Sequence, residues 1–582
     1  MSPDLPPVDP SVTAGLVAAL SPRLRKRLDA GVAKLADRPV VRDGDTVRIA
    51  VDDSTEVELH APGGTVTGAD AIRCGCLLAP DCLHRAAAAS AAPVAEPSAA
   101  AGPAEADTTA PETPGAEEPG EPELGEPETA TPEQCAAARV LHAAAAAVLE
   151  AGTDGSGAVV QAELLRAAHT ARLAGLPRAA ATAVSVVTAL RRARSADPAY
   201  LLADLVGALR DALTAALRLP RARGRELAEL RGTVRQPYRP DGSLRLYGLF
   251  TEPVLTATGY AGAVTWTADA EGRLYQVPDV APGGAGRAAG AADRTLRVGD
   301  TALTHRELSR AGLAVSGATV SPSGRLGAGA GVRAVRASGA GWRADPLDRL
   351  WAVPAGEQAA RALGGGHGLL FLEVTLVGTV REASGDCLLA RCGGVLVRLT
   401  AAHDHPALPH RDNLRLLAAA RGSRLRIVAR LTPAPHPRAL LLAAEHPTLP
   451  DSRVDLGLDR LQHADLPSGS ASPAPPAEVL APDEAPVHLL GRRVRQAASG
   501  GRLVLSFPGE TDADVRRLDR AGLGTAGELL HELHAAAAQR SRDVFGRLLP
   551  ADPDRFARAW LAAARYTDEV DRALCAAAWG GA

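Results

Sequence analysis

Three cysteines and one histidine lie within eleven residues near the beginning of the chain: Cys74, Cys76, Cys82 and His84. Three thiols and one imidazole form a common ligand set for a closed, tetrahedral zinc site. Residues two apart on an extended segment point to the same side, so Cys74 and Cys76 are expected to present both sulfurs to one metal. The spacing therefore predicts one structural Zn²⁺ bound by these four side chains, with no catalytic residue among them.

The segments around the cluster are predicted to hold the ligands in place. Residues 46–51 and 55–59 have strand-like alternation, and residues 85–92 are expected to form a short helix. Pro80 and Asp81 predict the start of that helix, with Asp81 as its N-cap. The last two ligands would then lie in the first helical turn, where the positive end of the helix dipole offsets thiolate charge.

Two arginines, Arg73 and Arg85, flank the cluster and are expected to offset its negative charge as well. The alternative is that three reduced, buried cysteines happen to lie close together. Metal-type spacing favours the zinc interpretation.

The pattern Cys-x-Cys, a gap, then Cys-x-His resembles the SWIM-type zinc finger, and all four ligand positions match over residues 45–92. The resemblance implies zinc as the cofactor and contact with DNA or protein. Bacterial SWIM domains occur in or beside Snf-type ATPases, so the resemblance also implies a helicase-like partner. The order of segments resembles that of actinobacterial SWIM-containing proteins of similar length.

The composition limits the fold and the compartment. A chain of 582 residues is too long for one core. Aromatic residues make up only 3%, so the cores must consist mainly of Ala, Val and Leu. Seven cysteines, no secretory signal and no apolar run of about 18–20 residues predict a cytoplasmic protein outside the membrane.

The predicted fold class is multidomain α+β, with a small ββα-type zinc finger, a helical bundle, a β-rich region with an OB-like barrel, and a helical C-terminus. The predicted segments are an N-terminal helix and lead-in (1–44), the zinc finger (45–92), an acidic disordered linker (93–132), the bundle (133–231), a β-rich domain (232–368), the OB-like barrel (369–446), a second linker (447–487) and the helical C-terminal region (488–582).

The linker at 93–132 holds ten acidic residues and no basic ones. Such a segment buries too little apolar surface to fold. Removing ten negative charges from a net charge of −3 leaves the remainder at about +7, which is compatible with a polyanionic partner. Only Lys26 and Lys34 among the 64 basic residues are lysine, so the abundance of arginine follows the general composition and is weak evidence for nucleic-acid binding.

Helices are predicted on both sides of this linker. Residues 10–38 suggest one amphipathic helix, because leucines recur every four residues from Leu16 to Leu28. Five helices are expected after the linker, at 133–150, 159–173, 178–194, 199–217 and 221–230. Their lengths and short connections predict an antiparallel bundle.

The pattern changes to strands after residue 232. Strands are expected at 244–250, 263–267, 273–277, 314–320 and 332–337, with a short helix opened by a Thr304–Glu307 capping box. Residues 369–446 then give three strands, a helix and two strands, the order of an OB-fold. Phe371 is its only aromatic residue, which argues against base stacking. Eight arginines remain as phosphate contacts of low specificity: 381, 391, 398, 415, 424, 426, 430 and 438.

Other motifs favour plainer interpretations. Cys387 and Cys392 with His403 and His405 offer a second metal set, but the spacing is unlike a zinc knuckle, and the two cysteines are expected on different strands. The glycines at 327–331 lack the strand-then-helix context of a dinucleotide site. Glycines 364–368 predict a flexible connection. His531-Glu532-Leu533-His534 lacks the His-Glu-x-x-His spacing.

Three functions remain open from the sequence alone. The first is a zinc-dependent accessory that binds DNA or protein, alongside a Snf-type helicase or ATPase. The second is a protein–protein scaffold without nucleic-acid contact. The third is an enzyme with an unrecognised non-local site, although no sequence motif favours catalysis.

Overall fold

The computed structural model divides the chain into two compact units. The first consists of Met1–Arg235 with Ala485–Thr567, and the second of Gln236–Glu484 with Asp568–Ala582. The structure describes residues 5–580 except 37, 53–54, 96–127, 199, 234–238, 257–259, 328–330, 383–384, 468–485, 508, 510, 540 and 550. The described residues form helices, several sheets and a closed barrel, which confirms the predicted α+β class.

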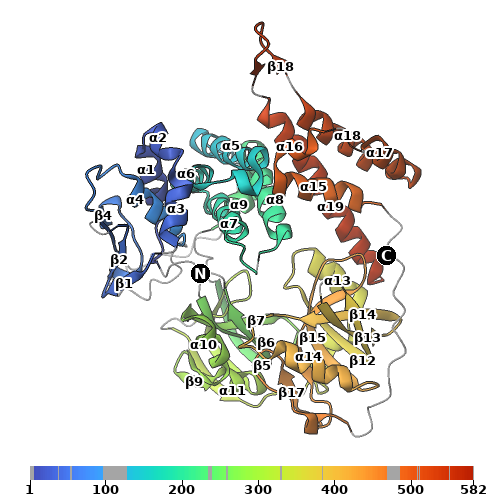
Figure 1. The fold of residues 1–582 in the computed structure, drawn as a ribbon. Coiled ribbons are helices and arrows are strands. Elements are labelled where there is room, and N and C mark those ends of the chain that lie inside the picture. Colours follow the sequence, from blue (N-terminus) through green and yellow to red (C-terminus); the bar gives the residue numbers. More distant parts are fainter. Residues whose placement is uncertain are drawn as a thin grey trace, which may run out of the picture. The chain divides into compact units, whose positions relative to one another are not determined.

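The first unit begins with a small α+β module that carries the cysteine cluster (Figure 1, blue). Its helices are α1 (Pro10–Ala19), α2 (Pro22–Arg25), α3 (Leu28–Ala36) and α4 (Leu83–Ala91), and its strands are β1 (Val40–Asp43), β2 (Thr46–Ala50), β3 (Glu56–His60) and β4 (Ile72–Cys74). The strands form one antiparallel sheet in chain order. Val47, Ile49, Val57 and Leu59 point from this sheet into one core with the helices.

The single helix predicted over 10–38 is wrong, because the chain forms three helices there. Ser21 caps α2 by accepting a hydrogen bond from the backbone N–H of Leu24, and Pro22 stands at the first helical position. Proline has no N–H to continue a preceding helix, so α1 ends before it. The leucine spacing still identified buried positions, since Leu16, Leu20 and Leu28 are all in the core.

The predicted bundle is present, with boundaries within a few residues of expectation except at the end of its first helix. It consists of α5 (Pro132–Gly155), α6 (Ala158–Leu173), α7 (Pro177–Arg194), α8 (Leu202–Arg218) and α9 (Gly224–Arg231). A capping box formed by Thr131 and Gln134 begins α5. Alanines fill much of the core between these helices, as the composition predicted.

The C-terminal helices pack on the same core as the bundle. They are α15 (His488–Gly500), α16 (Arg502–Leu505), α17 (Thr511–Arg520), α18 (Gly524–Ala538) and the long α19 (Pro553–Ala578), with a hairpin of β18 (Ser541–Arg542) and β19 (Leu548–Leu549) before α19. Leu490, Phe556 and Trp560 share one apolar cluster with Leu149 of α5.

Helix α5 is the one described helix that is long and apolar enough to cross a membrane by length and composition. Its most apolar 18-residue window has a mean hydropathy of 1.3, and 56% of that window is buried. The core helix of a bundle has the same properties.

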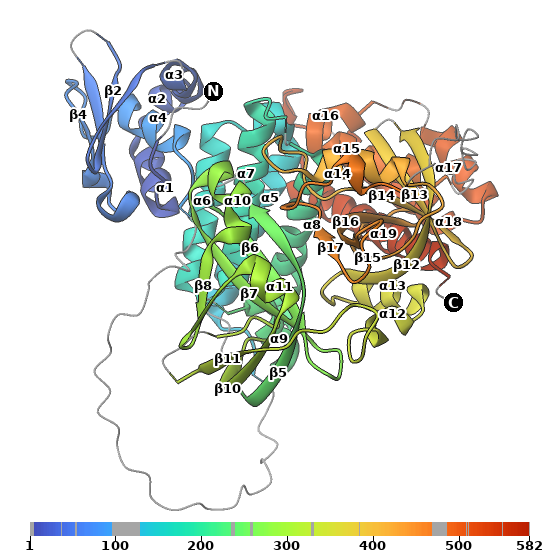
Figure 2. The ribbon, with the colours of Figure 1, turned by 90° about the horizontal axis from the view of Figure 1, so that it is seen from below.

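The second unit contains two β-structures whose main sheets share the pairing of their first strand. The first β-domain holds β5 (Arg239–Leu255), β6 (Tyr260–Ala268), β7 (Leu274–Pro282), α10 (Gly284–Ala289), β8 (Thr295–Val298), β9 (Thr301–Thr304), α11 (His305–Arg310), β10 (Gly312–Val320) and β11 (Arg333–Ala337) (Figure 2, green). Its main sheet has the order β11-β10-β5-β6-β7. A parallel bridge between Gln276 and Arg325 joins β7 to the segment after β10.

The predicted barrel over 369–446 is present as a closed five-stranded barrel. It consists of β12 (Leu369–Glu382), β13 (Gly385–Cys392), β14 (Val395–Ala401), α14 (His410–Ala419), β15 (Arg424–Leu431) and β16 (Arg438–Glu445). β12 pairs with both β13 and β15, and a parallel pairing of β14 with β16 closes the barrel. In each main sheet the first strand (β5 or β12) pairs with the second (β6 or β13) and with the fourth (β10 or β15), if the separate β8–β9 hairpin is not counted. The sequence did not reveal this repeat.

An apolar cluster of aromatic side chains joins the two β-structures. It includes Phe250 and Trp266 of the first β-domain, Phe371 of the barrel, and Trp342 and Trp351 between them. The indole N–H of Trp342 donates to the carbonyl of Leu249, and that of Trp351 donates to the carbonyl of Ile427. Helices α12 (Arg349–Ala352) and α13 (Ala355–Leu363) connect the two β-structures along the chain.

The two predicted linkers are only partly within the described residues. Most of the acidic linker lies outside them, but Val94 bridges to Val8 and Thr129 bridges to Arg223, so both ends of this segment join the folded structure. The second linker was predicted to begin at residue 447, and this boundary is wrong. A further strand, β17 (Arg453–Asp455), follows and pairs with β16, because Val454 and Leu456 complete the barrel core.

Candidate metal centre

The cysteine cluster lies where β4 meets α4. Cys74 is the last residue of β4, Cys76 follows in the connecting loop, and Cys82 is the N-cap of α4, with His84 in its first turn. The helix thus begins one residue later than the predicted Asp81 cap implies. Pairing of β3 with β4 fixes the position of Cys74, because Val57 lies opposite it in the register.

The four ligand atoms converge on one point. The three sulfurs and one imidazole nitrogen all lie within 4.8 Å of one another, and the Sγ of Cys74 is 3.6 Å from the Nδ1 of His84. Cys82 is buried, and the other three ligands are half-buried. This is the group that the sequence predicted, and it can hold a metal ion.

The thiols of the cluster have unequal proton affinities. Burial is the largest influence on Cys74 and raises the pKa of its thiol to about 12. Burial also raises the pKa of Cys82. Burial opposes ionisation of Cys76 too, but hydrogen bonds from the backbone at Leu78 and Ala79 and from the neighbouring thiols lower its pKa overall. A bound cation would stabilise all three thiolates, because metal ligands bind in their deprotonated form.

Arg85 holds the surrounding backbone together rather than facing the sulfurs. Its side chain is buried, and its three nitrogen groups donate to the carbonyls of Ile72, Pro80 and Ala69. These bonds tie α4 to β4 and to the ligand loop. The predicted role of Arg85 as a counter-charge is thus replaced by a positioning role. Arg73 is exposed, and its Nε donates to the carbonyl of Asp70.

The alternative second metal set does not come together. Cys387 and Cys392 were predicted on different strands, but both lie on β13, five residues apart and therefore on opposite faces. The buried Sγ of Cys387 is 3.9 Å from a nitrogen of Arg438. The imidazoles of His403 and His405 instead accept hydrogen bonds from nearby backbone N–H groups. Among the described residues, Cys74, Cys76, Cys82 and His84 form the one group suited to a metal.

The helical His-Glu-Leu-His motif has a structural role. The imidazole of His534 lies within hydrogen-bonding distance of the Thr511 hydroxyl and the Leu505 carbonyl. Glu532 forms an ion pair with Arg555 at 2.9 Å. Leu533 is buried in the core. None of these side chains is arranged as a metal or catalytic site.

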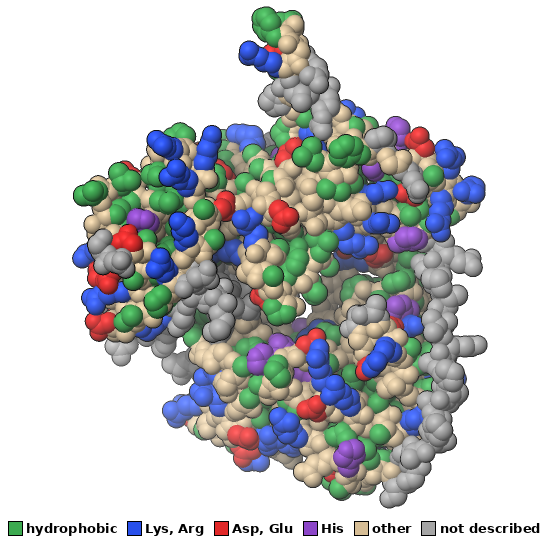
Figure 3. Space-filling view, viewed as in Figure 1, with side chains coloured by type: hydrophobic (Ala, Val, Ile, Leu, Met, Phe, Trp, Pro, Cys, Tyr) green, Lys and Arg blue, Asp and Glu red, His purple; other side chains and the backbone are tan. Residues whose placement is uncertain are grey.

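Most of the arginines predicted as phosphate contacts in the barrel are already engaged. Seven of the eight bind carboxylates or a backbone carbonyl, and the exception is Arg391. Two of these arginines, Arg398 and Arg438, share one partner, because the Glu382 carboxylate forms an ion pair with each of them. The face shown in Figure 3 accordingly has basic and acidic side chains interspersed.

Two arginines that sequence reasoning did not single out lie together in the first β-domain. Arg297 of β8 and Arg325, after β10, are exposed and line one cavity of about 280 Å³ with Thr295. Neither guanidinium has a hydrogen bond or ion pair to the described residues. Asp279 lines the same cavity, but it is paired with Arg287 at 2.8 Å and with Arg294 at 3.6 Å. No local sequence signal distinguishes such arginines from those with partners.

Comparison with known proteins gives no family. No protein-family model matches the chain, and no curated protein matches it. One solved structure with some similarity is the HINa domain of Ifi202 in complex with a 20-base-pair double-stranded DNA, at 10% identity over 35% of this chain and 91% of that one, with a TM-score of 0.19. Another, described as "Structural mimicry for functional antagonism", has 8% identity over 35% and 89%, also at 0.19. Scores this low support no conclusion about this chain.

Proposed function

We propose that the chain is a zinc-stabilised binding protein of the SWIM type that contacts nucleic acid and performs no catalytic step. The zinc proposal rests on the Cys74, Cys76, Cys82 and His84 cluster. In a tetrahedral zinc site, bonds of about 2.0–2.3 Å place the ligand atoms about 3.3–3.8 Å apart. The 4.8 Å limit on the present separations means that shifts of roughly 1 Å close the site around zinc.

The zinc is structural in this proposal. Four protein ligands fill a tetrahedron and leave no position for the water that catalytic zinc requires. The bound ion holds the end of β4, the ligand loop and the start of α4 together. Replacing zinc by Co²⁺ should give the absorption of a four-coordinate, sulfur-rich site, whereas a five-coordinate spectrum with bound water would refute the structural role.

The nucleic-acid proposal is carried by Arg297 and Arg325. Two exposed guanidinium groups without acidic partners line one cavity, and such groups suit phosphate oxygens. Both belong to a β-domain whose five-stranded main sheet pairs its first strand with its second and fourth, as the OB-like barrel does, and OB-folds bind oligonucleotides. The separate β8–β9 hairpin, which carries Arg297, is inserted between the third and fourth strands of that sheet. Phosphate contacts without base contacts favour binding of low sequence specificity.

Anisotropy titration of the intact chain with labelled single- and double-stranded oligonucleotides at several salt concentrations tests this proposal. Each phosphate contact contributes about 0.7–0.9 to the slope of log K against log salt. Replacing Arg297 and Arg325 together by Ala should therefore lower the slope by about 1.4–1.8. The matched control is Arg349→Ala, because Arg349 is exposed but already paired with Asp345. Binding with an unchanged slope in the double variant would contradict the assignment.

A protein–protein scaffold is the second candidate, and the neutralised arginines of the barrel favour it. This proposal predicts no oligonucleotide binding at moderate salt and recovery of a protein partner by the intact chain. A Snf-type helicase or ATPase is the proposed partner in either case, and the cytoplasm is the proposed location. Co-purification with tagged chain, with and without nuclease treatment, separates a direct protein contact from one bridged by nucleic acid.

A further inference from the structure

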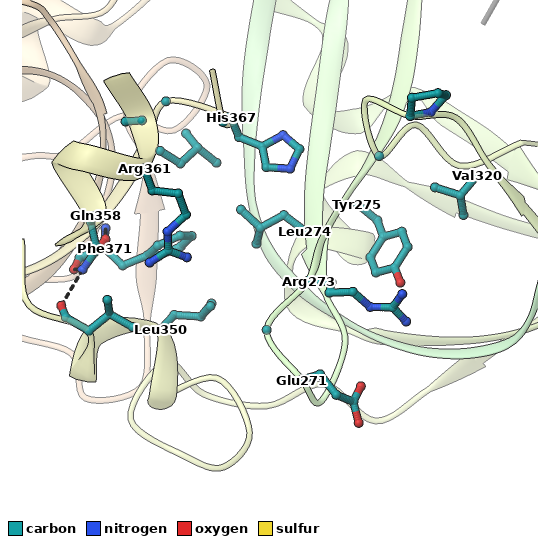
Figure 4. A pocket seen from close by; sticks show the side chains of 18 of the residues that line it. Glu271, Arg273, Leu274, Tyr275, Val320, Leu350, Gln358, Arg361, His367 and Phe371 are labelled. Carbon is teal, nitrogen blue, oxygen red and sulfur yellow. Dashed lines mark hydrogen bonds between the residues drawn. The ribbon is translucent and has the colours of Figure 1, made fainter. Parts of the chain in front are cut away.

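A cavity of about 540 Å³ lies within the second unit, between the first β-domain and the helices that lead into the barrel. Figure 4 shows its two walls, with Arg273, Leu274 and Tyr275 on one side and Arg361 with Phe371 on the other. This volume falls within the range of small-molecule sites in proteins. None of the sequence motifs explains it.

Several polar groups of the cavity are already satisfied by the protein. The buried amide of Gln358 is saturated by the carbonyls of Val353 and Phe371 and by the N–H of Phe371. Arg273 forms an ion pair with Asp269 at 2.8 Å, and the Tyr275 hydroxyl donates to the same carboxylate. These groups shape the walls and leave little capacity for a ligand.

Arg361 differs from these groups. It lies on α13, is exposed, and its guanidinium has no hydrogen bond or ion pair to the residues that the structure describes. In Figure 4 its side chain extends into the space between the walls, whereas Glu271 on the opposite rim points away from it. The cavity therefore offers one unpaired permanent positive charge, with the apolar side chains of Leu274 and Phe371 on its two walls.

The glycine-rich connection after α13 forms the back of the cavity. The backbone N–H of Gly366 donates to the carbonyl of Arg361, and the carbonyl of Gly368 accepts from Leu431, so the loop is fixed at both ends. His367 projects from this loop, and its ring lies edge-on to Trp266 with centroids 5.4 Å apart. The imidazole reaches the opposite wall at Gly324: a Cβ at that position would lie 3.5 Å from the Cε1 atom of His367.

The imidazole is a neutral hydrogen-bonding group at this position. Partial burial lowers the pKa of His367, so at neutral pH the ring offers one N–H donor and one nitrogen acceptor. The cavity thus has a guanidinium at its mouth, apolar side chains on both walls and a neutral imidazole at its back.

We propose that this cavity is a binding site for a small aromatic organic anion, with its phosphate or carboxylate on Arg361 and its ring between Leu274 on one wall and Phe371 on the other. The guanidinium supplies a planar pair of donors that matches either acid group. A bare inorganic anion would leave the apolar side chains of the two walls without a contact. The inference is independent of the nucleic-acid proposal, because Arg361 does not line the Arg297 cavity.

Saturation-transfer NMR on the intact chain tests the proposal with phenyl phosphate and benzoate as probes, and with inorganic phosphate and phenol for comparison. Ligands of about ten non-hydrogen atoms bind in the low millimolar range when they gain about 0.3 kcal/mol per atom. Both aromatic anions should bind, and the stronger of the two identifies the preferred acid group. Phenol and inorganic phosphate should bind at least about tenfold more weakly, because phenol lacks the acid group and inorganic phosphate lacks the aromatic ring.

Two variants locate the site. Arg361→Ala should weaken phenyl phosphate binding by about tenfold or more, since it removes a charge-assisted contact. Ala362→Trp should abolish binding by filling the cavity, and it keeps the test valid if the first variant folds poorly. Arg333→Ala is the matched control, because Arg333 is also exposed and its guanidinium has no hydrogen bond or close ion pair to the described residues, but it does not line the cavity. Unchanged binding in Ala362→Trp, or equal loss in the control, would overturn the proposal.

Discussion

Replacing Arg85 by Met removes the guanidinium that holds the ligand loop and keeps most of the apolar stem. The native side chain donates to three backbone carbonyls, at Ile72, Pro80 and Ala69. Ile72 is buried, so its carbonyl loses a partner in the variant, which costs about 1–3 kcal/mol. Ala69 and Pro80 are exposed, and water can replace the bonds to their carbonyls at small cost.

We therefore expect the free energy of unfolding of the N-terminal module to fall by about 1–3 kcal/mol, most of it from the Ile72 carbonyl. Zinc affinity should fall by about 10- to 100-fold, the usual cost of losing a group that orients metal ligands. Competition with a chromophoric chelator measures the affinity, and thermal unfolding of the zinc-loaded protein measures the stability.

Arg73→Met provides the control for this prediction. Arg73 is exposed next to Cys74 and donates only a 3.4 Å bond to the carbonyl of Asp70, so its loss should change stability by less than about 0.5 kcal/mol. The positioning role of Arg85 is refuted if Arg85→Met keeps zinc affinity within twofold of the native chain. It is refuted equally if Arg73→Met causes the larger loss, because charge near the sulfurs would then be the dominant effect.

Two further predictions concern the metal and a buried carboxyl. Cys76→Ser should remove the zinc detected by elemental analysis and unfold the N-terminal module, while helical circular dichroism from the bundle persists; retained zinc would contradict the ligand assignment. Burial, then repulsion from Asp459, raises the pKa of Asp455 to about 7. The folded state binds this proton more tightly than the unfolded state, so stability falls as pH rises from about 4 through 7, by roughly 4 kcal/mol at most. Asp455→Asn should flatten that part of the profile in urea titrations at several pH values, whereas an unchanged slope would exclude Asp455 as its cause.

Local patterns predicted the elements that depend on neighbours in sequence. The cluster from Cys74 to His84 was identifiable because its ligands lie within eleven residues and its spacing reflects metal geometry. The bundle helices followed from apolar periodicity and from breaks at proline and glycine. The single helix predicted over 10–38 is the exception. Its leucine periodicity continues past Pro22, where one helix has ended and the next begins.

Features that depend on distant residues were not predictable. The partners of Arg85 span residues 69 to 80 and are backbone carbonyls, which carry no side-chain signal. Trp342 and Trp351 cover the junction of two β-structures, a position that is set by tertiary packing alone. The two β-structures share a strand pairing, but their sequences show no matching pattern of residues. Different apolar residues can support the same pairing of strands, so the repeat could not be detected from residue spacing.

The distribution of acidic partners decides which arginines are available to a ligand. In the barrel, Glu382 neutralises Arg398 and Arg438, so replacing either arginine should change stability rather than affinity for an anion. Arg297, Arg325 and Arg361 have no such partner among the described residues, and all three line cavities. In a chain with 64 basic residues, a count of positive charges says little about binding. An arginine that lines a cavity without a carboxylate partner retains its hydrogen-bonding capacity for a ligand. By this property the proposed nucleic-acid contacts and the proposed aromatic-anion site involve different cavities of the second unit.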